Sequence, residues 1–360
     1  MGRRLRQLGV LGTLVLAHSA AAAPSPPSIL SRVPLPSLGR LGERVSEVWK
    51  RGIRGTVGLQ NRATSNDSAN LWVVDTQYQG KSFFDGFDFY TDRDPTNGQV
   101  QYVDRDTAFN EGLAYVTSDG KAVMKVDNTT WLTAGQNRKS VRIQSQKRFN
   151  GGLFILDLQR SPHGCGTWPA FWTVGPNWPQ GGEIDIFEGV HENTKNQATF
   201  HTADGCTITD PQNFTGNLLA SDCSAFADNN AGCGLINDSA ASFGAPFNAV
   251  GGGVFASRWD NNGVWIWFFH RSTIPNDIIQ NTPTPELWGK PTALLSNSSC
   301  APNRYFWDHQ IVFDITFCGD WAGASYSDPA NGCPGTCSDH VLDPGNFYVS
   351  IYEHYCIGLR

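Results

Sequence analysis

The stretch "GVFASRWDNNGVWIWFFHR", residues 253–271, places two β-rich runs on either side of a turn at residues 260–263. Asn and Gly tolerate the positive φ angles that tight hairpin turns require, so the pattern predicts an antiparallel hairpin. In residues 264–269, apolar side chains occupy both sets of alternating positions, which makes the second strand apolar on both faces. Such a strand is buried on both sides or lines an aromatic groove, and we favour burial on both sides.

The same pattern of short β-rich runs and turns continues through the chain from Leu71 onward. Short apolar or alternating runs are separated by turns rich in Gly, Asn, Asp and Pro, and neither a long helical periodicity nor an internal repeat is present. Many short strands with this punctuation predict an all-β fold, a sandwich or jelly roll. Further strands are expected at 122–127, 140–149, 152–159, 183–190, 197–204 and 310–318.

The composition of the 360-residue chain favours a globular protein with a neutral ligand. Only 17% of the residues are charged, and the chain contains 38 Gly and 12 Trp, which is the opposite of a disordered composition. The formal net charge is −6, and no basic run occurs beyond the N-terminus, which argues against nucleic acid as a partner. Many aromatic rings with few charges suit a ligand that stacks on rings.

The first residues read as a secretory signal peptide, so we expect a secreted, extracellular protein. A charged segment precedes a short apolar run at 8–17, and small residues suitable for cleavage follow up to residue 23. Residues 24–70 are rich in Pro, Ser, Gly and Arg and are interpreted as a linker or pro-segment, with Lys50-Arg51 either a processing site or plain linker. A catalytic domain is expected over 71–360. No later stretch is apolar enough to cross a membrane, and no tail predicts a lipid anchor.

Secretion determines how the nine cysteines are interpreted. In an oxidising compartment, we expect the eight from Cys165 to Cys337 to form disulfides, with their pairing left open, and Cys356 to be the odd one. The "CPGTC" pair at 333–337 lacks a matching Cys or His pair at zinc spacing, so a metal site there is disfavoured. N-glycosylation sequons occur at Asn66, Asn128, Asn213, Asn237 and Asn297.

The run "GGEIDIFEGV", residues 181–190, places three carboxylates on a strand with apolar neighbours. Side chains alternate along a strand, so Glu183 and Asp185 share a face while Glu188 falls on the other one. A β-bulge, which inserts one extra residue, would return Glu188 to the face of Glu183. Two carboxyl groups about 5–5.5 Å apart are what a retaining glycosidase needs, one as nucleophile and one as acid/base.

Two other interpretations of the three acids stay open at this point. Clustered carboxylates are also typical of calcium sites. They can equally be solvated residues of an edge strand, although the apolar neighbours weigh against an edge. The upstream stretch "GCGTWPAFWTVGPNWPQGG" favours catalysis, because Trp168, Trp172 and Trp178 offer a platform for flat sugar faces.

Taken together, "GTWPAFW…NWPQGGEIDIFEGV" resembles the E-x-D-x-x-E signature of glycoside hydrolase family 16. The chain is similar in particular to the fungal secreted endo-β-1,3(4)-glucanases, or laminarinases. Further supporting stretches lie at 80–103, 140–145, 198–206, 231–234, 242–248, 271–278 and 314–337.

The resemblance implies a concanavalin-like β-jelly roll with a concave substrate cleft and no cofactor or catalytic metal. It implies Glu183 as nucleophile, Asp185 as its assistant and Glu188 as acid/base. It further implies substrate contacts from residues near the acids, namely Trp168, Trp172, Trp178, His201 and Trp321. We expect a monomer acting on a β-glucan polysaccharide, of β-1,3 or mixed β-1,3/1,4 linkage, by double displacement.

Two parts of the chain depart from the family pattern. Residues up to about 70 lie outside the family core, and from Phe347 the tail "NFYVSIYEHYCIGLR" differs from the usual final strand. We therefore expect an irregular last strand, with consequences for its register and for the sheet edge. The alternatives to hydrolysis are a transglycosylase of the same fold, a glucan-binding lectin, and a structural wall protein.

Overall fold

The hairpin predicted at residues 253–271 forms as β14 (Gly253–Asp260) and β15 (Gly263–His270), which pair antiparallel along their whole length. The structure, a computed structural model, describes the backbone of residues 72–359 and the side chains of residues 72–354. The predicted signal peptide and the linker or pro-segment lie outside the described residues.

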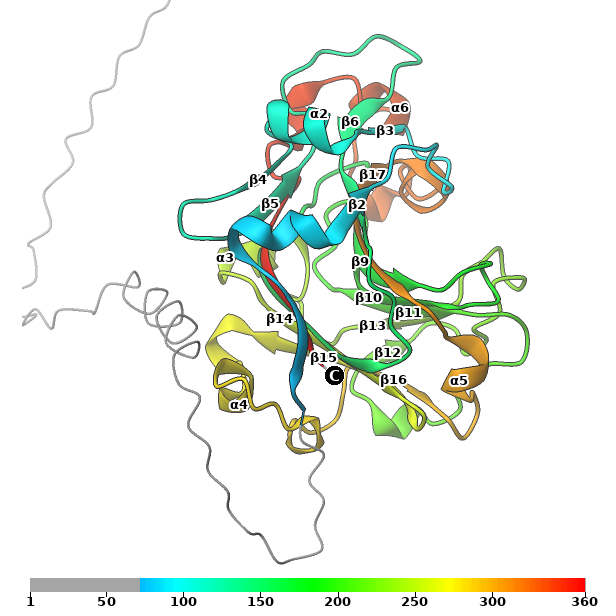
Figure 1. Cartoon of the computed structure of the whole chain (residues 1–360). Coiled ribbons are helices and arrows are strands. Elements are labelled where there is room, and N and C mark those ends of the chain that lie inside the picture. Colours follow the sequence, from blue (N-terminus) through cyan, green and yellow to red (C-terminus); the bar gives the residue numbers. More distant parts are fainter. Residues whose placement is uncertain (1–71, 360) are drawn as a thin grey trace, which may run out of the picture. The chain divides into compact units, whose positions relative to one another are not determined.

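Two eight-stranded sheets dominate the described part of the chain (Figure 1). The first sheet runs in the order β16 (Ala293–Ser296), β15, β14, β8 (Gly152–Arg160), β18 (Ile351–Leu359), β5 (Ala122–Lys125) and β4 (Ala114–Val116), with β1 (Val74–Tyr78) added against β18. The second runs β12 (Asn217–Leu218), β13 (Cys233–Ile236), β11 (Gln197–His201), β10 (Glu183–Glu188), β9 (Thr167–Val174), β17 (Gln310–Phe317), β7 (Arg142–Ser145) and β2 (Phe87–Phe89). All pairings within these two sheets are antiparallel.

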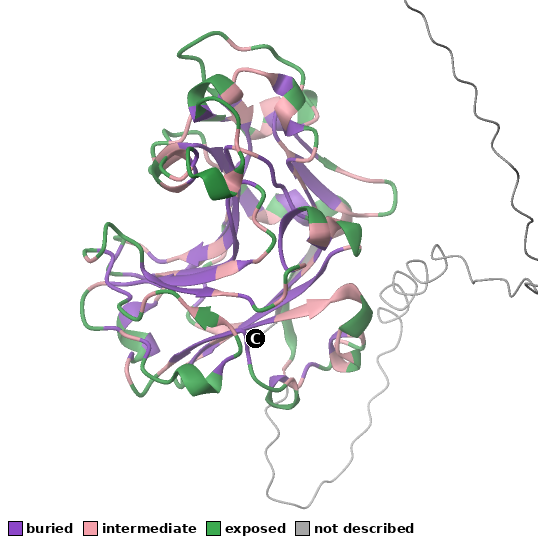
Figure 2. Ribbon diagram, turned by 180° about the vertical axis from the view of Figure 1, so that it is seen from behind, coloured by how far each residue is buried: buried purple, intermediate pink, exposed green. Residues whose placement is uncertain are grey.

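Aromatic side chains join the two sheets into one core. Phe187 on β10 packs edge-on against Phe255 on β14, with ring centroids 5.1 Å apart, and Phe313 on β17 lies 6.0 Å from Tyr352 on β18. These four residues are each at most 2% exposed. Burying one such side chain contributes about 1.5–3 kcal/mol, so the sandwich is held by its shared apolar layer (Figure 2). The predicted all-β sandwich is thus confirmed.

Burial on both faces of β15, favoured from its sequence, holds for the middle of the strand, whereas Trp265, Phe268 and Phe269 are half-buried. Val264 and Ile266 are at most 1% exposed on the side of the shared core. On the other side, Trp267 is 4% exposed and meets Trp288 edge-on at 5.3 Å. The segment containing Trp288 therefore covers the outer face of this strand.

The C-terminal tail behaves differently from the expectation of an altered sheet edge. Residues Ile351–Leu359 form β18, which lies inside the first sheet, between β8 on one side and β5 and β1 on the other. Its register against β8 shifts between Glu353 and His354, so the expected irregularity is present but an interior strand accommodates it. The Cys356 side chain lies outside the described residues.

Four disulfides link all eight cysteines from Cys165 to Cys337, as predicted. They join Cys165 to Cys333, Cys206 to Cys300, Cys223 to Cys233, and Cys318 to Cys337. Three of these bridges close loops of 94, 168 and 10 residues around the second sheet and its connections. They restrict the unfolded chain and so stabilise the folded one.

Short helices and one small parallel sheet fill the connections. The two-stranded sheet pairs β3 (Val100–Tyr102) with β6 (Arg138–Ser140), and it lies near α2 and α6 in Figure 1. In the described residues no helix is long and apolar enough to cross a membrane. The α-helices are α2 (Arg105–Asn110), α3 (Gly244–Ala249), α4 (Asn276–Ile279), α5 (Pro302–Tyr305) and α6 (Cys337–His340). The 3-10 turns are η1 (Gly80–Gly86), η2 (Pro211–Asn213), η3 (Arg271–Thr273), η4 (Pro285–Leu287), η6 (Pro329–Asn331) and η7 (Pro344–Phe347), and η5 (Gly319–Gly323) is a π-helical turn.

Candidate active site

The strand β10 carries the β-bulge that its carboxylate spacing predicts. Its register against both neighbours, β9 and β11, is interrupted after Asp185. Phe187 consequently stays in the shared core at 0% exposure, while Glu188 joins Glu183 and Asp185 on the outer face of the sheet. One extra residue thus gathers three acids that regular alternation would separate.

The Asn196 side chain satisfies the backbone groups that the bulge frees. Its Oδ1 accepts a hydrogen bond from the Glu188 N–H at 2.9 Å, and its Nδ2 donates to the Ile186 carbonyl at 3.0 Å. Its own N–H donates to the Ser242 hydroxyl at 2.9 Å. Asn196 is 2% exposed, so these bonds replace ladder bonds in a buried place where unpaired polar groups are costly. Asn196 is therefore a positioning residue for Glu188, and no short motif in the sequence marks it.

Burial sets the protonation of Glu188. The side chain is 9% exposed, and this burial raises its pKa to about 8, against the opposing effect of a hydrogen bond from the Trp168 indole. The Trp168 Nε1–H donates to Glu188 Oε1 at 2.7 Å. The negative charges of Glu183 and Asp314 raise the pKa further. At neutral pH, Glu188 is thus mainly a protonated acid able to donate.

Asp185 is the most enclosed of the three acids. It is 2% exposed, and burial, followed by the charges of Glu183 and Glu188, holds its pKa well above the usual value. Its Oδ2 makes no hydrogen bond to the described residues and lies 3.5 Å from His201 Nε2. The other ring nitrogen of His201, Nδ1, lies 2.9 Å from Asn230 Oδ1, an acceptor, which places the ring proton on Nδ1. His201 Nε2 faces Asp185.

A fourth acid, Asp314 on β17, extends the network across the sheet. Its Oδ1 accepts from the Trp172 indole at 3.0 Å, and its Oδ2 accepts from the Tyr102 hydroxyl at 3.2 Å. Burial raises its pKa to about 6, and the Arg142 guanidinium, 4.0 Å away, opposes that rise. Asp314 was not among the residues predicted from sequence. The signal was available, because "QIVFDITFC" places one acid in an otherwise apolar run.

The predicted aromatic residues divide into two groups. Trp168 and Trp321 pack edge-on with centroids 5.7 Å apart, and through its hydrogen bond Trp168 ties this pair to Glu188. Trp172 is half-buried between Asp314 and Arg142, whose guanidinium lies 5.1 Å from its ring. Trp178, in the turn between β9 and β10, is 44% exposed. The structure therefore places Trp168, Trp172, Trp321 and His201 around the acids, and Trp178 in the exposed turn that precedes β10.

The acids also form a possible cation cluster. Glu183, Asp185 and His201 bring one ligand atom each within 4.8 Å of one another. Calcium takes six to eight oxygen ligands, so a set containing a histidine nitrogen does not fit that ion. The calcium interpretation of the three acids is thus disfavoured by the donor set.

The fold and the site together define a class of protein. Two packed antiparallel sheets present a bulged acid strand, with one glutamate held as a protonated acid and indoles beside it. A protonated carboxyl group beside a second carboxyl group on the same face is typical of enzymes that cleave glycosidic bonds.

Sequence comparison identifies the family. A sequence model of the XgeA-like, catalytic GH16 domain matches residues 87–357. The chain therefore belongs to glycoside hydrolase family 16, as the E-x-D-x-x-E motif predicted. A probable glycosidase of Schizosaccharomyces pombe is 48% identical over 283 residues, which are 78% of this chain and 67% of that protein. A probable endo-1,3(4)-beta-glucanase of Aspergillus niger is 43% identical over 298 residues, which are 82% of this chain but 39% of that protein. The chain thus spans less than half the length of this Aspergillus relative.

Solved structures agree with the fold. GH16 laminarinase 16A from Phanerochaete chrysosporium, described with 6-O-glucosyl-laminaritriose in both donor and acceptor sites, superposes with a TM-score of 0.77 at 36% identity. The match covers 81% of this chain and 100% of that one. An elongating GH family 16 beta-1,3-glucosyltransferase gives the same TM-score at 40% identity, over 80% of this chain and 100% of that one. The predicted jelly roll is confirmed, and the neighbours include both a hydrolase and a transferase.

Proposed function

We propose that this protein is a secreted, retaining endo-β-glucanase that cleaves β-1,3 or mixed β-1,3/1,4-glucans by double displacement. The observation that carries the proposal is the unequal setting of two glutamates on one bulged strand. Glu188 is buried, bonded to an indole and protonated at neutral pH, whereas Glu183 is half-buried at the start of the strand. Environments that push two carboxyl groups apart assign one as acid and the other as nucleophile.

In the proposed first step, the Glu183 carboxylate attacks the anomeric carbon. The bond to the glycosidic oxygen breaks, and that oxygen takes the proton of Glu188, so the leaving sugar departs as a neutral alcohol. In the second step, water attacks the same carbon, Glu188 accepts a proton from the water, and Glu183 leaves as a carboxylate. Asp185 lies between Glu183 and His201, and its pKa, held well above the usual value by burial and by the neighbouring acids, disfavours a further negative charge beside the nucleophile.

The proposal of double displacement rests on the bulge, which brings the two glutamates to the same face of β10. On that face, the charge of Glu183 raises the pKa of Glu188, so the two carboxyl groups interact. An inverting enzyme needs about 6.5–9.5 Å between its carboxyl groups, to leave room for a water molecule. A bulge that draws Glu188 back beside Glu183 favours the closer, retaining arrangement.

The substrate class follows from the relatives and from the site together. The curated relatives of Aspergillus are named endo-1,3(4)-beta-glucanases, and the Phanerochaete structure holds a β-glucan. The indoles beside Glu188 suit the flat faces of glucosyl units. We therefore expect laminarin or a mixed-linkage glucan as substrate, and internal cleavage rather than trimming from one end.

A transglycosylase is the second candidate function, because a glucosyltransferase is among the structural neighbours at 40% identity. Both reactions share the glycosyl-enzyme and differ in whether water or a sugar hydroxyl resolves it. Incubation with laminarin, followed by product sizing with and without added laminaritriose, separates them. We expect new reducing ends and shorter products under both conditions. Products longer than the starting chains would favour the transferase, and the absence of new reducing ends would favour a lectin.

Secretion is part of the proposal. Eight cysteines in four disulfides are typical of an oxidising compartment. Two sequon asparagines, Asn213 and Asn297, are exposed and available for glycosylation, whereas Asn237 is 2% exposed and accepts a hydrogen bond from the Ser239 N–H. Expression with the native N-terminus in a fungal host, followed by N-terminal sequencing of the medium protein, tests both cleavage and export.

A further inference from the structure

A buried histidine that the proposed reaction does not use lies just beyond the end of the acid strand. His191 is 0% exposed, and its φ angle of 56° lies in the left-handed region, which few residues other than glycine adopt. Its backbone is held against the start of β9, because its N–H donates to the Thr167 carbonyl at 3.1 Å and its carbonyl accepts from the Gly164 N–H at 2.9 Å. Backbone in such a sparsely populated region persists only where the surroundings hold it, and such positions cluster at functional sites.

Each nitrogen of the His191 ring has a partner, and the two partners belong to the segments that carry the indoles of the site. Nδ1 accepts a hydrogen bond at 3.0 Å from the N–H of Gly166, which shortly precedes Trp168. Nδ1 therefore carries no proton in the neutral ring, so Nε2 carries it. Nε2 donates that proton to the hydroxyl of Ser325, 3.0 Å away, which shortly follows Trp321.

The protonation state of His191 suits this pair of hydrogen bonds. Burial lowers its pKa, the charge of Glu192 opposes that effect, and the charge of His340 lowers the pKa further. The ring is therefore neutral at neutral pH. A doubly protonated ring would point a second N–H at the Gly166 N–H and break that contact. The neutral ring thus links the two segments at the pH where the enzyme is expected to work.

The Ser325 hydroxyl passes this link on to Trp321. It donates to the Trp321 carbonyl at 2.7 Å, and the Ser325 N–H donates to the same carbonyl at 2.9 Å. The Trp321 ring packs edge-on against Trp168, with centroids 5.7 Å apart, and Trp168 donates to Glu188 at 2.7 Å. The contacts therefore form a closed path that starts at Glu188, passes through both indoles and ends at His191, on the same segment as Glu188.

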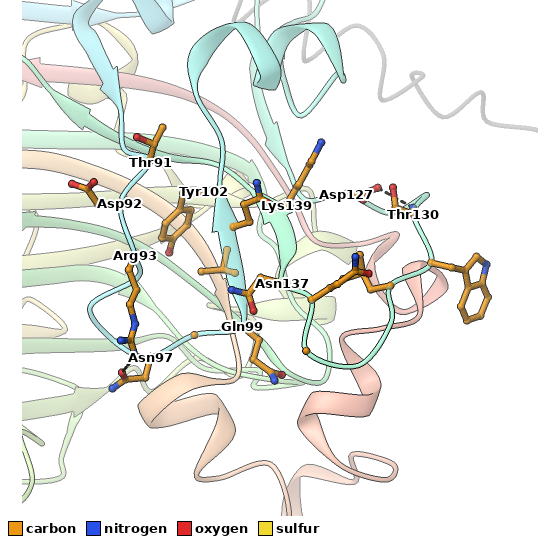
Figure 3. Close-up of a pocket in the computed structure, with 17 residues that line it drawn as sticks. Thr91, Asp92, Arg93, Asn97, Gln99, Tyr102, Asp127, Thr130, Asn137 and Lys139 are labelled. Atoms are coloured by element: carbon orange, nitrogen blue, oxygen red, sulfur yellow. Dashed lines mark hydrogen bonds between the residues drawn. The ribbon is translucent and has the colours of Figure 1, made fainter.

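The turn η5, which carries Trp321, has a second attachment that lies on the surface. Asn97 donates to Asp320 at 3.0 Å and accepts from Arg93 at 2.9 Å. Figure 3 shows Arg93 and Asn97 together on one wall of a hollow of about 890 Å³. Exposed groups exchange such partners for water at little cost, whereas a buried group that loses its partner is left unsatisfied. The buried link through His191 is therefore the stronger of the two attachments.

We propose that His191 is a positioning residue for the acid. Through the Ser325 hydroxyl it fixes the position of Trp321. Trp321 in turn holds the Trp168 indole, which donates to Glu188. The proposal rests on the proposed glucanase function, in which Glu188 is the acid. A histidine that only stabilised the fold would leave the surroundings of Glu188 unchanged in any variant that still folds.

The experiment measures the pKa of Glu188 itself, by carbon-13 NMR titration of full-length protein labelled at its glutamate carboxyl groups. Glu188→Gln identifies the signal, because it removes that carboxyl group alone. His191→Asn keeps an oxygen that can accept from Gly166, and Asn tolerates the left-handed backbone, but its shorter side chain does not reach Ser325. Ser325→Ala removes the same hydrogen bond from the other side.

We expect each substitution to raise the pKa of Glu188 by about 0.5, because a weakened hydrogen bond from Trp168 favours the carboxylate less. The two substitutions together should give the same rise as either one, since they break one bond. In protein that already carries Trp168→Phe, neither should raise the pKa further. His163→Asn is the control and should leave the pKa in place, because His163 is 7% exposed and its ring bonds Glu192 at 2.9 Å instead of Ser325.

Two outcomes overturn the proposal. One is an unchanged pKa of Glu188 in the folded variants, and the other is a rise that persists in the Trp168→Phe background, since the effect would then not pass through the indole. Ser325→Ala decides alone if His191→Asn does not fold, because Ser325 is half-buried and the Cys165–Cys333 and Cys318–Cys337 bridges cross-link the same segments.

Failure of the proposed function is visible separately, as the absence of laminarin hydrolysis by the unmodified protein. The titration needs no turnover, so it decides on the link between His191 and Glu188 in either case. If the protein hydrolyses laminarin, the alkaline limb of its kcat/KM profile should move to higher pH in His191→Asn and in Ser325→Ala, in step with the titration.

Discussion

Replacing Trp168 by Phe tests how the proposed acid is tuned. The substitution removes the indole N–H that donates to Glu188 Oε1 at 2.7 Å and keeps an aromatic ring against Trp321. That hydrogen bond favours the ionised carboxylate, because it lowers the pKa of Glu188. A hydrogen bond to a charged group contributes about 1.5–3 kcal/mol, and about 1.4 kcal/mol corresponds to one pKa unit. The pKa of Glu188 should therefore rise by about 1–2 from its value of about 8.

The assay is the pH dependence of kcat/KM on laminarin, which reports the ionisation of the free enzyme. Glu188 must be protonated to donate, so a higher pKa extends activity to higher pH. We expect the alkaline limb of the kcat/KM profile to move to higher pH by about 1 pH unit or more. Trp288→Phe is the matched control, because its indole donates to Asp277 at 2.9 Å away from the acids, and it should leave the limb in place. An alkaline limb that stays put or moves to lower pH in Trp168→Phe would refute this account of the acid.

Three further predictions concern stereochemistry, the indoles and stability. Hydrolysis should retain configuration, so proton NMR of fresh product should show the β-anomer first, and an initial α-anomer would contradict double displacement. Trp178→Ala should raise KM with little change in melting temperature, because the ring is 44% exposed. Trp172→Ala should lower the melting temperature, because its indole donates a hydrogen bond to the buried Asp314. Equal losses of melting temperature in both variants would show that both rings serve stability and not substrate binding. Glu188→Gln should be more stable than the unmodified protein at pH 8 by about 2–4 kcal/mol. In the folded protein the pKa of Glu188 is about 8, above its ordinary value of 4.5. The unmodified protein therefore keeps its full stability below pH 4.5, and it loses the contribution of Glu188 as the pH rises from 4.5 through 8. Urea unfolding at pH 5 and pH 8 measures this, and a stability gap that does not widen with pH would count against the assigned pKa.

The strand pattern and the acid cluster could be predicted from sequence because both follow from local rules. The turn at residues 260–263 and the apolar runs on either side of it favour the pairing of β14 with β15 through local rules. The bulge after Asp185 follows from two requirements: Phe187 must face the core, and Glu188 must lie on the face of Glu183. Regular alternation along a strand cannot satisfy both, so one extra residue is needed.

The partners of the acids could not be predicted, because they come from distant segments. Asn196 reaches the bulge from the turn before β11, Asn230 reaches His201 from a loop closed by the Cys223–Cys233 bridge, and Tyr102 reaches Asp314 from the small parallel sheet. The spacing of residues along the sequence carries no information on such contacts between distant segments. The interior position of the tail after Phe347 could not be predicted for a related reason, because it depends on strands more than 190 residues away, such as β8.

The assignment of the two glutamates is the central claim, and pre-steady-state release of nitrophenol from an aryl β-oligoglucoside tests it most directly. A nitrophenolate leaves without help from an acid, so Glu188→Gln should keep the burst of nitrophenol while hydrolysing laminarin very poorly. Glu183→Gln lacks the nucleophile and should lose the burst, and thermal melting first shows that each variant is folded. A burst that survives in Glu183→Gln and disappears in Glu188→Gln would contradict the account, because the two acids would then stand on the opposite sides of the scissile bond.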